Sequence, residues 1–176
     1  MPDPAARDTA TNLAKSITQD DAFRAALADL IAFPTDASAP DAPLHAYLAH
    51  VAQGFAAMGF ETQGFTSEGR PFLLASRIDD ASRPTVLGYA HGDTVPGMEG
   101  QWAEGRDPWQ LTEDAATGRW YGRGIADNKG QMLVNMTALQ AVLAVRGSLG
   151  FNLHMLIEMG EELGSPGFGK VCDRLK

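Results

Sequence analysis

The sequence has few of the features that mark secreted, membrane-bound or nucleic-acid-binding proteins. Its 176 residues contain a single cysteine, Cys172, which excludes an intrachain disulfide framework and favours a reducing, cytoplasmic location. Apolar runs stay well below the ~18 residues of a membrane span, and the first residues do not resemble a secretory signal. Lys and Arg number 14 against 22 Asp and Glu, so the net charge of -8 argues against nucleic-acid and anionic-membrane partners.

The apolar content of 44% is enough for the core of one domain. Apolar residues with helical spacing, and shorter apolar runs, define the expected elements. They predict helices over 19–33, 43–58 and about 128–146, and strands over 60–65, 71–78, 85–90 and 150–158. Residues 34–43 and the turn-rich stretch 92–118 are expected to be loops. The alternation of helices and strands predicts an α/β sheet with helices packed on its faces.

Three polar motifs interrupt this pattern where a strand ends or a helix begins, which is where open α/β sheets bind ligands. The first motif places His91 and Asp93 directly after the strand 85–90, on the same side of an extended chain. A metal-bound histidine commonly donates its second ring N–H to a carboxylate. A surface histidine beside a Gly-Asp turn is the alternative interpretation.

The second motif is the run YGRGIADNKG at 121–130, whose glycines suggest a backbone held close to another group. Its spacing matches neither a phosphate-binding P-loop nor a dinucleotide-binding fingerprint. Asp127 is either a ligand or the N-cap of the next helix. The third motif, Glu161 and Glu162, follows the most apolar strand, and such adjacent carboxylates repel unless a cation or donors compensate. A solvated acidic turn is the alternative.

Other chemically active side chains fit structural roles better. His45 and His50 lie on the polar side of the helix 43–58, and His154 lies inside a strand, so we interpret all three as structural or surface residues. Trp102 and Trp109 are expected to pack a long loop rather than to stack on a ligand.

The order and spacing of the three motifs point to a metal site. A His-x-Asp is followed by an Asp 36 positions after the histidine and by a Glu-Glu pair about as far again. Imidazole and carboxylates suit Zn²⁺ or a similar divalent ion. A shared carboxylate can bridge two ions ~3.5–4 Å apart, as in two-metal hydrolases.

The segments HGDTVP, W…DPW…YGRGIADNKG and GEELGS resemble the di-zinc amidohydrolases of metallopeptidase family 20. That family includes acetylornithine deacetylase, succinyl-diaminopimelate desuccinylase, aminoacylase, glutamate carboxypeptidase and carnosine-type dipeptidases. The resemblance extends from the helix near residue 20 to about Ser165. The Asp-Asn-Lys-Gly run is similar to that of some dipeptidase branches, which leaves the substrate open.

The resemblance implies a role for each motif residue. His91 would be a ligand of one zinc, with Asp93 as the catalytic carboxylate that orients it, and Asp127 would bridge two zinc ions. Glu161 would be the catalytic general base, and Glu162 a ligand of the second zinc. Co or Mn are possible substitutes for zinc.

The resemblance also implies a three-layer, phosphorylase/hydrolase-like zinc-exopeptidase fold with a mixed, mostly parallel sheet, incomplete at its C-terminus. Residues 1–176 would be the N-terminal portion of the catalytic domain, without the lid or dimerisation domain through which a homodimer would form. Family members carry further ligands beyond this point, so we expect the chain alone to be nearly inactive.

The expected function is zinc-dependent hydrolysis of the amide bond of an N-acyl amino acid or short peptide. The alternative is a non-catalytic metal-binding or regulatory remnant of the same fold.

Overall fold

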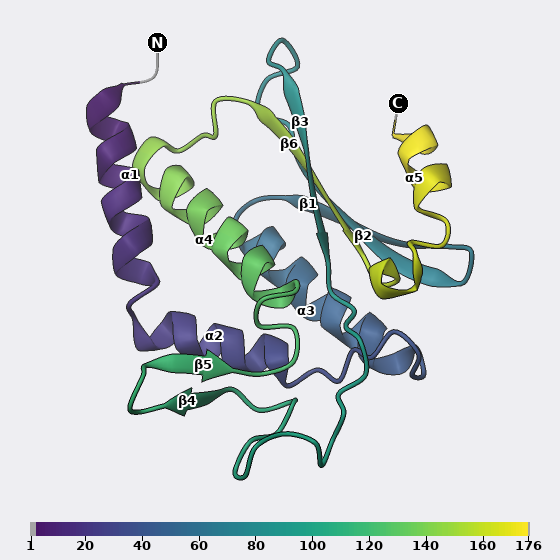
Figure 1. The fold of residues 1–176 in the computed structure, drawn as a ribbon. Helices are drawn as coiled ribbons and strands as arrows, with labels where there is room; N and C mark the ends of the chain where they lie inside the picture. The colour runs from purple at the N-terminus through teal and green to yellow at the C-terminus, as the bar shows by residue number, and fades with distance from the viewer. Residues whose placement is uncertain (1–2, 176) are drawn as a thin grey trace.

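The computed structural model describes residues 3–175, which form a four-stranded sheet, a small hairpin and flanking helices (Figure 1). In chain order the elements are α1 (Pro4–Ile17), α2 (Asp21–Ile31), α3 (Ala42–Ala57), β1 (Glu61–Ser67), β2 (Arg70–Arg77), β3 (Thr85–His91), β4 (Thr112–Asp114), β5 (Arg119–Tyr121), α4 (Lys129–Arg146), β6 (Asn152–Glu158), the 3-10 helix η1 (Glu161–Leu163) and α5 (Phe168–Arg174). No helix within residues 3–175 is long and apolar enough to cross a membrane.

The main sheet is mixed, as expected, with the strand order β1-β2-β6-β3. The expectation that it is mostly parallel is wrong for the described residues, because only β3 and β6 pair in parallel while β1–β2 and β2–β6 are antiparallel. Local turn chemistry accounts for the β1–β2 pair. Glu68 and Gly69 both have positive φ, 48° and 78°, which suits a tight two-residue hairpin and therefore antiparallel strands.

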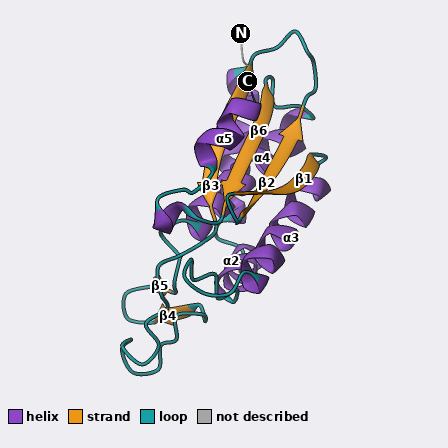
Figure 2. Ribbon diagram, turned by 90° about the vertical axis from the view of Figure 1, so that its right-hand side faces the viewer, coloured by secondary structure: helices purple, strands orange, loops and turns teal. Residues whose placement is uncertain are grey.

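Helices cover both faces of this sheet, which confirms the three-layer arrangement. On one face, α3 and α4 pack against the sheet around the larger apolar core, which includes Leu44, Phe55, Met132 and Met155. On the other face, α5 packs Val171 against Phe72 and Leu156. Figure 2 shows α5 and the α3–α4 pair on opposite sides of the sheet.

Three of the observed helices agree with the apolar periodicity. Helix α2 buries Phe23, Leu27, Leu30 and Ile31, and α3 buries Leu44, Leu48, Val51 and Phe55 together with Tyr47. Helix α4 buries Met132, while Leu133, Met136, Leu139 and Leu143 are partly buried against the same core. Long amphipathic segments are therefore the part of the fold that periodicity predicts most directly.

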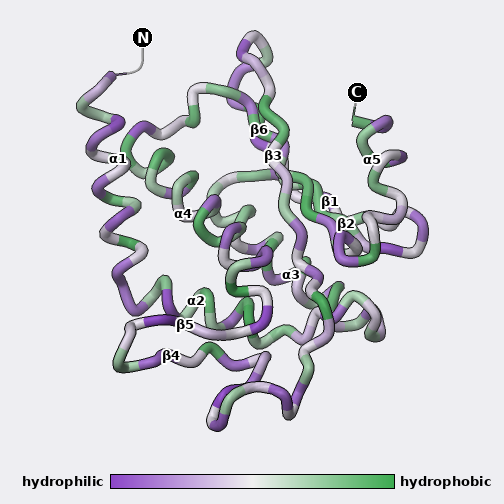
Figure 3. Tube along the Cα trace, viewed as in Figure 1, coloured by the Kyte–Doolittle hydropathy of each residue, from purple (hydrophilic) through white to green (hydrophobic). Residues whose placement is uncertain are grey.

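Helix α1 and the paired strands β4 and β5 were not expected. Helix α1 begins after Asp3, whose side chain accepts the Ala5 backbone N–H at 3.0 Å, but it buries only Ala10 and packs on α4. Its residues alternate between weakly hydrophobic and hydrophilic ones, which leaves little apolar signal (Figure 3). The loop predicted over 92–118 also contains β4, which pairs with β5 outside the main sheet.

The parallel pair β3–β6 sets the position of the polar motifs. His91, the last residue of β3, lies opposite Glu158, the last residue of β6. The Gly92 N–H then donates to the Glu158 carbonyl at 2.9 Å. The first and third motifs consequently leave the sheet side by side, and the second motif precedes α4 at the same edge (Figure 1).

Candidate metal centre

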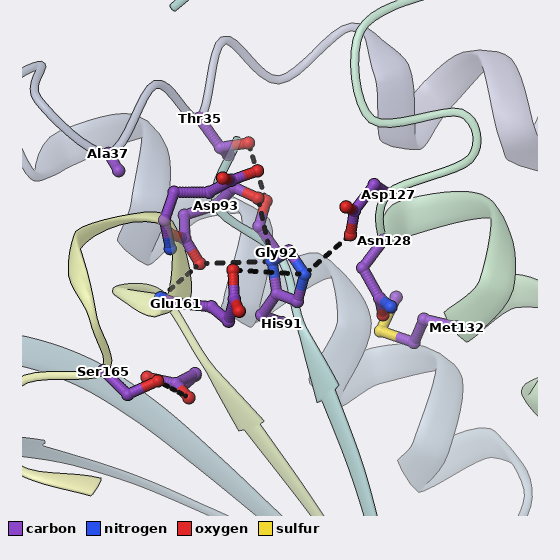
Figure 4. A network of polar contacts seen from close by, with 12 residues as sticks. Thr35, Ala37, His91, Gly92, Asp93, Asp127, Asn128, Met132, Glu161 and Ser165 are labelled. Atoms are coloured by element: carbon purple, nitrogen blue, oxygen red, sulfur yellow. Dashed lines mark hydrogen bonds and ion pairs between the residues drawn. The ribbon is translucent and has the colours of Figure 1, made fainter. Parts of the chain in front are cut away.

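His91 is the buried centre of the candidate site, with 4% of its side chain exposed. Its Nδ1 faces Asp93, lying 3.1 Å from the backbone oxygen and 3.5 Å from Oδ1. Its Nε2 lies 2.9 Å from Oδ1 of Asp127 (Figure 4). The first and second motifs therefore meet at this imidazole, across 36 positions of sequence.

Asp93 connects His91 to the third motif. Its carboxylate is fully buried, and each of its oxygens accepts a backbone N–H, from Glu161 at 3.2 Å and from Glu162 at 3.1 Å. The alternative of a surface histidine beside an ordinary turn does not describe this arrangement. One carboxylate holds both the ring of His91 and the start of η1.

Asp127 is exposed and reaches the site from the turn before α4. Its side chain is 72% exposed, and the peptide bond to Asn128 is cis. Helix α4 has Asn128 at its N-cap without a side-chain capping hydrogen bond. The alternative of Asp127 as a simple N-cap therefore does not hold, and its carboxylate is directed to His91 instead.

Glu161 and Glu162 add two further carboxylates to the site, on the side that faces solvent. Oε2 of Glu161 lies 3.9 Å from Nε2 of His91, and its side chain is 44% exposed. Burial raises the pKa of Glu162, and the charges of Asp127, Glu161 and Asp93 raise it further, whereas His91 opposes them. This mutual repulsion shows that the carboxylates share one small region.

The same charges act on His91. Burial disfavours its protonated form, but the hydrogen bond and charge of Asp93, together with the hydrogen bond to Asp127, raise the pKa of His91 to about 9. The carboxylates thus generate a negative potential at Nε2. A divalent cation between Nε2 and these oxygens would relieve that repulsion.

The donor set fits a divalent metal ion, although the side chains as they stand do not form a closed cage. Within residues 3–175, no group of three or more His, Cys, Asp and Glu is arranged to hold an ion directly. Two tetrahedral zinc ligands lie roughly 3.3 Å from each other when each is ~2.0–2.1 Å from the ion. The 2.9 Å between His91 Nε2 and Asp127 Oδ1 is close to that separation. A small outward rotation of the exposed Asp127 would open the gap.

The other histidines lie apart from this group, as expected. His154 bonds through Nδ1 to the Ser76 hydroxyl at 2.7 Å, and the ring of His50 packs against Phe33. The two loop tryptophans also make structural contacts: Trp102 donates to the Gly97 carbonyl and Trp109 to the Glu99 carboxylate.

Sequence reasoning missed the buried residues that support the site. Thr35 and Lys129 are fully buried. The Thr35 hydroxyl donates to the Gly92 carbonyl, in the loop after His91, and Lys129 Nζ donates to the Phe33 carbonyl, two residues before Thr35. Thr35 lies in a stretch whose composition predicts only a loop, and no local pattern distinguishes it. Lys129 stands inside the second motif, and no local pattern marks this lysine as buried.

The carboxyl edge of the sheet thus gathers one histidine and several carboxylates from three separate motifs. Residues 87–176 match the profile of the Peptidase family M20/M25/M40, and the chain belongs to this family. The fold is also that of human carnosine dipeptidase 1, with a TM-score of 0.83 and 27% identity over 99% of this chain and 38% of that protein.

Two curated relatives are also named as dipeptidases. A cysteinylglycine-S-conjugate dipeptidase of Corynebacterium striatum is 41% identical over 92 residues, which cover 51% of this chain and 19% of the relative. A Beta-Ala-His dipeptidase of Mus musculus is 38% identical over 107 residues, which cover 60% of this chain and 21% of the relative. The chain thus aligns with about one fifth of each relative.

Proposed function

We propose that this protein contributes His91, Asp127 and Glu162 to a site for two zinc ions and hydrolyses the amide bond of a small peptide. In this proposal residues 1–176 supply part of the catalytic domain. Membership of a metallopeptidase family supports dependence on metal, and the donor types favour zinc, with Co or Mn as substitutes. A cytoplasmic location remains an expectation from the sequence.

The observation that carries the proposal is the pair of contacts made by His91. Asp93 fixes one ring nitrogen from inside the protein, and the other nitrogen faces the exposed carboxylate of Asp127 at 2.9 Å. A carboxylate behind a ligand histidine sets its tautomer and orientation. Asp127 contacts His91, and its charge raises the pKa of Glu162, which supports Asp127 as the ligand shared by the two ions.

In the proposed reaction, Glu161 and Asp93 have different roles. Bound divalent ions would supply Lewis acidity toward the substrate carbonyl and toward water. Glu161 is exposed at the site, and its Oε2 lies 3.9 Å from Nε2 of His91, beyond hydrogen-bond distance, so it is free to accept a proton from the attacking water. The same carboxyl then returns the proton to the leaving nitrogen. Asp93 keeps His91 oriented throughout, because it is buried and hydrogen-bonded on both oxygens.

A dipeptide is the substrate class that we favour. The curated relatives at 41% and 38% identity are named as dipeptidases. N-acyl amino acids are the competing class, since their hydrolysis breaks the same kind of bond beside a free carboxylate. A panel of dipeptides and N-acyl amino acids, assayed with a longer chain that also carries the further ligands expected from the family resemblance, separates the two classes.

The neighbouring glutamates provide the sharpest test. Glu161→Gln should lower turnover by about 10²–10⁴-fold while leaving the zinc content unchanged, because the general base is not a ligand. Glu162→Gln should lower the zinc content, because it replaces a carboxylate ligand. Zinc is measured by atomic emission after dialysis, and turnover by release of free amino acid.

Two results would contradict the proposal. If Glu161→Gln lost zinc and Glu162→Gln retained it, Glu161 would be the zinc ligand and Glu162 the general base. Zinc binding without turnover by a longer chain that also carries the further ligands expected from the family resemblance would favour the non-catalytic remnant instead.

A further inference from the structure

Lys129 is an ammonium group enclosed in the protein interior. Its side chain is fully buried, and Nζ donates to the Phe33 carbonyl at 2.7 Å. Nζ also lies 5.4 Å from the ring centre of Tyr47 and 5.5 Å from that of Trp109. Within residues 3–175 no carboxylate forms an ion pair with it, and burial lowers the pKa of Lys129 to about 7.

A need to fill space in the core does not explain why a lysine occupies position 129. Taking an ammonium out of water costs several kcal/mol unless compensating contacts are made. A methionine of similar length would fill the same space without that cost. The contacts of Nζ therefore indicate what Lys129 does, and the main one is with a backbone carbonyl 96 positions away.

That carbonyl belongs to a short segment, residues 33–37, that supports the candidate metal site. The Phe33 oxygen also accepts the Thr35 N–H at 2.9 Å, so Lys129 stabilises the turn that presents Thr35. The Thr35 hydroxyl donates to the Gly92 carbonyl at 2.7 Å, and the Thr35 carbonyl accepts the Thr94 N–H at 2.9 Å. Gly92 lies between His91 and Asp93 in sequence, and Figure 4 shows Thr35 above that loop.

The stem of Lys129 makes a second connection between the same regions. A Cβ at Gly124 would lie 3.0 Å from Cδ of Lys129 and 3.0 Å from Cγ2 of Thr94. The glycine therefore lets the turn before Asp127 pass close to both the lysine stem and the loop of the first motif. Lys129 itself is two positions after Asp127, at the start of α4.

We propose that Lys129 and Thr35 are positioning residues that hold the His91–Asp93 loop and the Asp127 turn against residues 33–37. Neither side chain contacts a candidate ligand atom. Together they fix the separation of His91 and Asp127, which arise from different elements. The inference rests on the proposed function in one respect, namely that this separation matters for binding a metal ion.

The test uses the isosteric variants Lys129→Met and Thr35→Val, with Lys15→Met and Thr66→Val at exposed positions as matched controls. The first measurement is Zn²⁺ affinity by competition with a chromophoric chelator, together with the absorption spectrum of the Co²⁺-loaded protein. The second is amide hydrogen exchange of the metal-free protein, followed at Thr94 and Ala37, whose N–H groups donate to Thr35 and Thr94.

Positioning predicts a local effect. Each test variant should lose about 10–100-fold in Zn²⁺ affinity and change the Co²⁺ spectrum, as outer-sphere changes do. The Thr94 and Ala37 amides should exchange about tenfold faster or more, whereas amides of the β1–β2 pair should keep their rates. Both controls should match the wild type.

Other results overturn the inference. Unchanged exchange at Thr94 and Ala37 would show that neither side chain braces the loop. Faster exchange throughout the sheet would show that Lys129 and Thr35 are ordinary core residues. If the wild type itself binds no Zn²⁺, the proposed function fails, and hydrogen exchange alone then decides whether the two residues hold the loop.

Discussion

The candidate site has two halves that differ in how strongly the fold holds them. His91 and Asp93 are buried, with side chains 4% and 0% exposed, and both are hydrogen-bonded to neighbouring loops. Asp127 and Glu161 are 72% and 44% exposed and contact the site mainly through His91. The buried half is positioned by folding, whereas the exposed half can adjust to a cation or substrate.

A catalytic metal site needs both rigidly held ligands and an open side for substrate and water. A ligand such as His91 needs a fixed tautomer and direction, which burial and a carboxylate partner provide. Ligands on the open side must leave room for substrate and water, as in catalytic metal sites. Substitutions in the buried half should therefore change folding stability as well as metal binding, and those in the exposed half should change metal binding alone.

The largest stability effect is expected for Asp93→Ala. It removes the acceptor of two backbone N–H groups and the partner of a buried histidine, which should lower the free energy of unfolding by about 2–4 kcal/mol. Asp127→Ala should cost about 1 kcal/mol at most, because that carboxylate is largely exposed. Urea denaturation of both variants in the presence of a chelator makes the measurement. Equal losses would remove the distinction between the two halves.

Zinc should stabilise the wild type by an amount that depends on its free concentration. At 100 times the dissociation constant, one bound ion adds about 2.7 kcal/mol, and a chelator removes this gain. Asp127→Ala should lose most of the zinc-dependent gain while its metal-free stability stays near that of the wild type. Thermal melts with zinc and with chelator test this, and an undiminished zinc effect in Asp127→Ala would exclude it as a ligand.

Gly92→Ala should destabilise the protein from inside the buried half. A Cβ at Gly92 would overlap the ring of Tyr47 and approach the sulfur of Met159, and both neighbours are fully buried. Such overpacking costs about 1–3 kcal/mol. Gly169→Ala, in α5, is the matched control, because an added Cβ there would meet no packed atom within 4 Å, and it should be neutral or slightly stabilising. Chemical denaturation gives the free energy of unfolding of both variants. Equal values would show that the loop at Gly92 rearranges to accept the added methyl group without cost.

The smallest effect is expected from the exposed ion pair between Glu68, in the β1–β2 turn, and Lys170, in α5. Glu68 accepts from Lys170 at 2.6 Å, and this hydrogen bond and charge lower the pKa of the Glu68 carboxyl. A carboxyl with a lowered pKa stabilises the folded state at neutral pH, and the contribution disappears as the pH falls through that pKa, below 4.5. Glu68→Gln should therefore melt slightly lower than the wild type at pH 7 but equally at pH 3. A difference that persists at pH 3 would assign the effect to packing.

The sequence predicts secondary structure best where one element has a clear apolar periodicity. The apolar periodicity of α2, α3 and α4 predicts each helix within a few residues. The spacing of His91, Asp127 and Glu161 predicts one site because β3 and β6 end side by side at the same edge. The mostly parallel sheet that the resemblance implied is wrong for the described strands. The left-handed backbone at Glu68, which forms the β1–β2 hairpin, is not indicated by a glutamate in the sequence.

What the sequence could not provide are the long-range contacts. Helix α1 has one buried residue, Ala10, so it depends on its packing against α4 rather than on a strong apolar stripe. Thr35 and Lys129 act through contacts 57 and 96 positions away, and neither distance leaves a trace in the local pattern. The residues that support a site are harder to predict than those that form it, because their role is defined only by the tertiary structure.

The most direct test of the central claim is a crystal structure of the zinc-soaked protein with anomalous difference density measured at the zinc edge. The account predicts a peak between Nε2 of His91 and Oδ1 of Asp127, within ~2.0–2.2 Å of both atoms. A second peak is expected between Asp127 and Glu162. Density at His45, His50 or His154 with none beside His91 would contradict the claim that the three motifs form a metal centre.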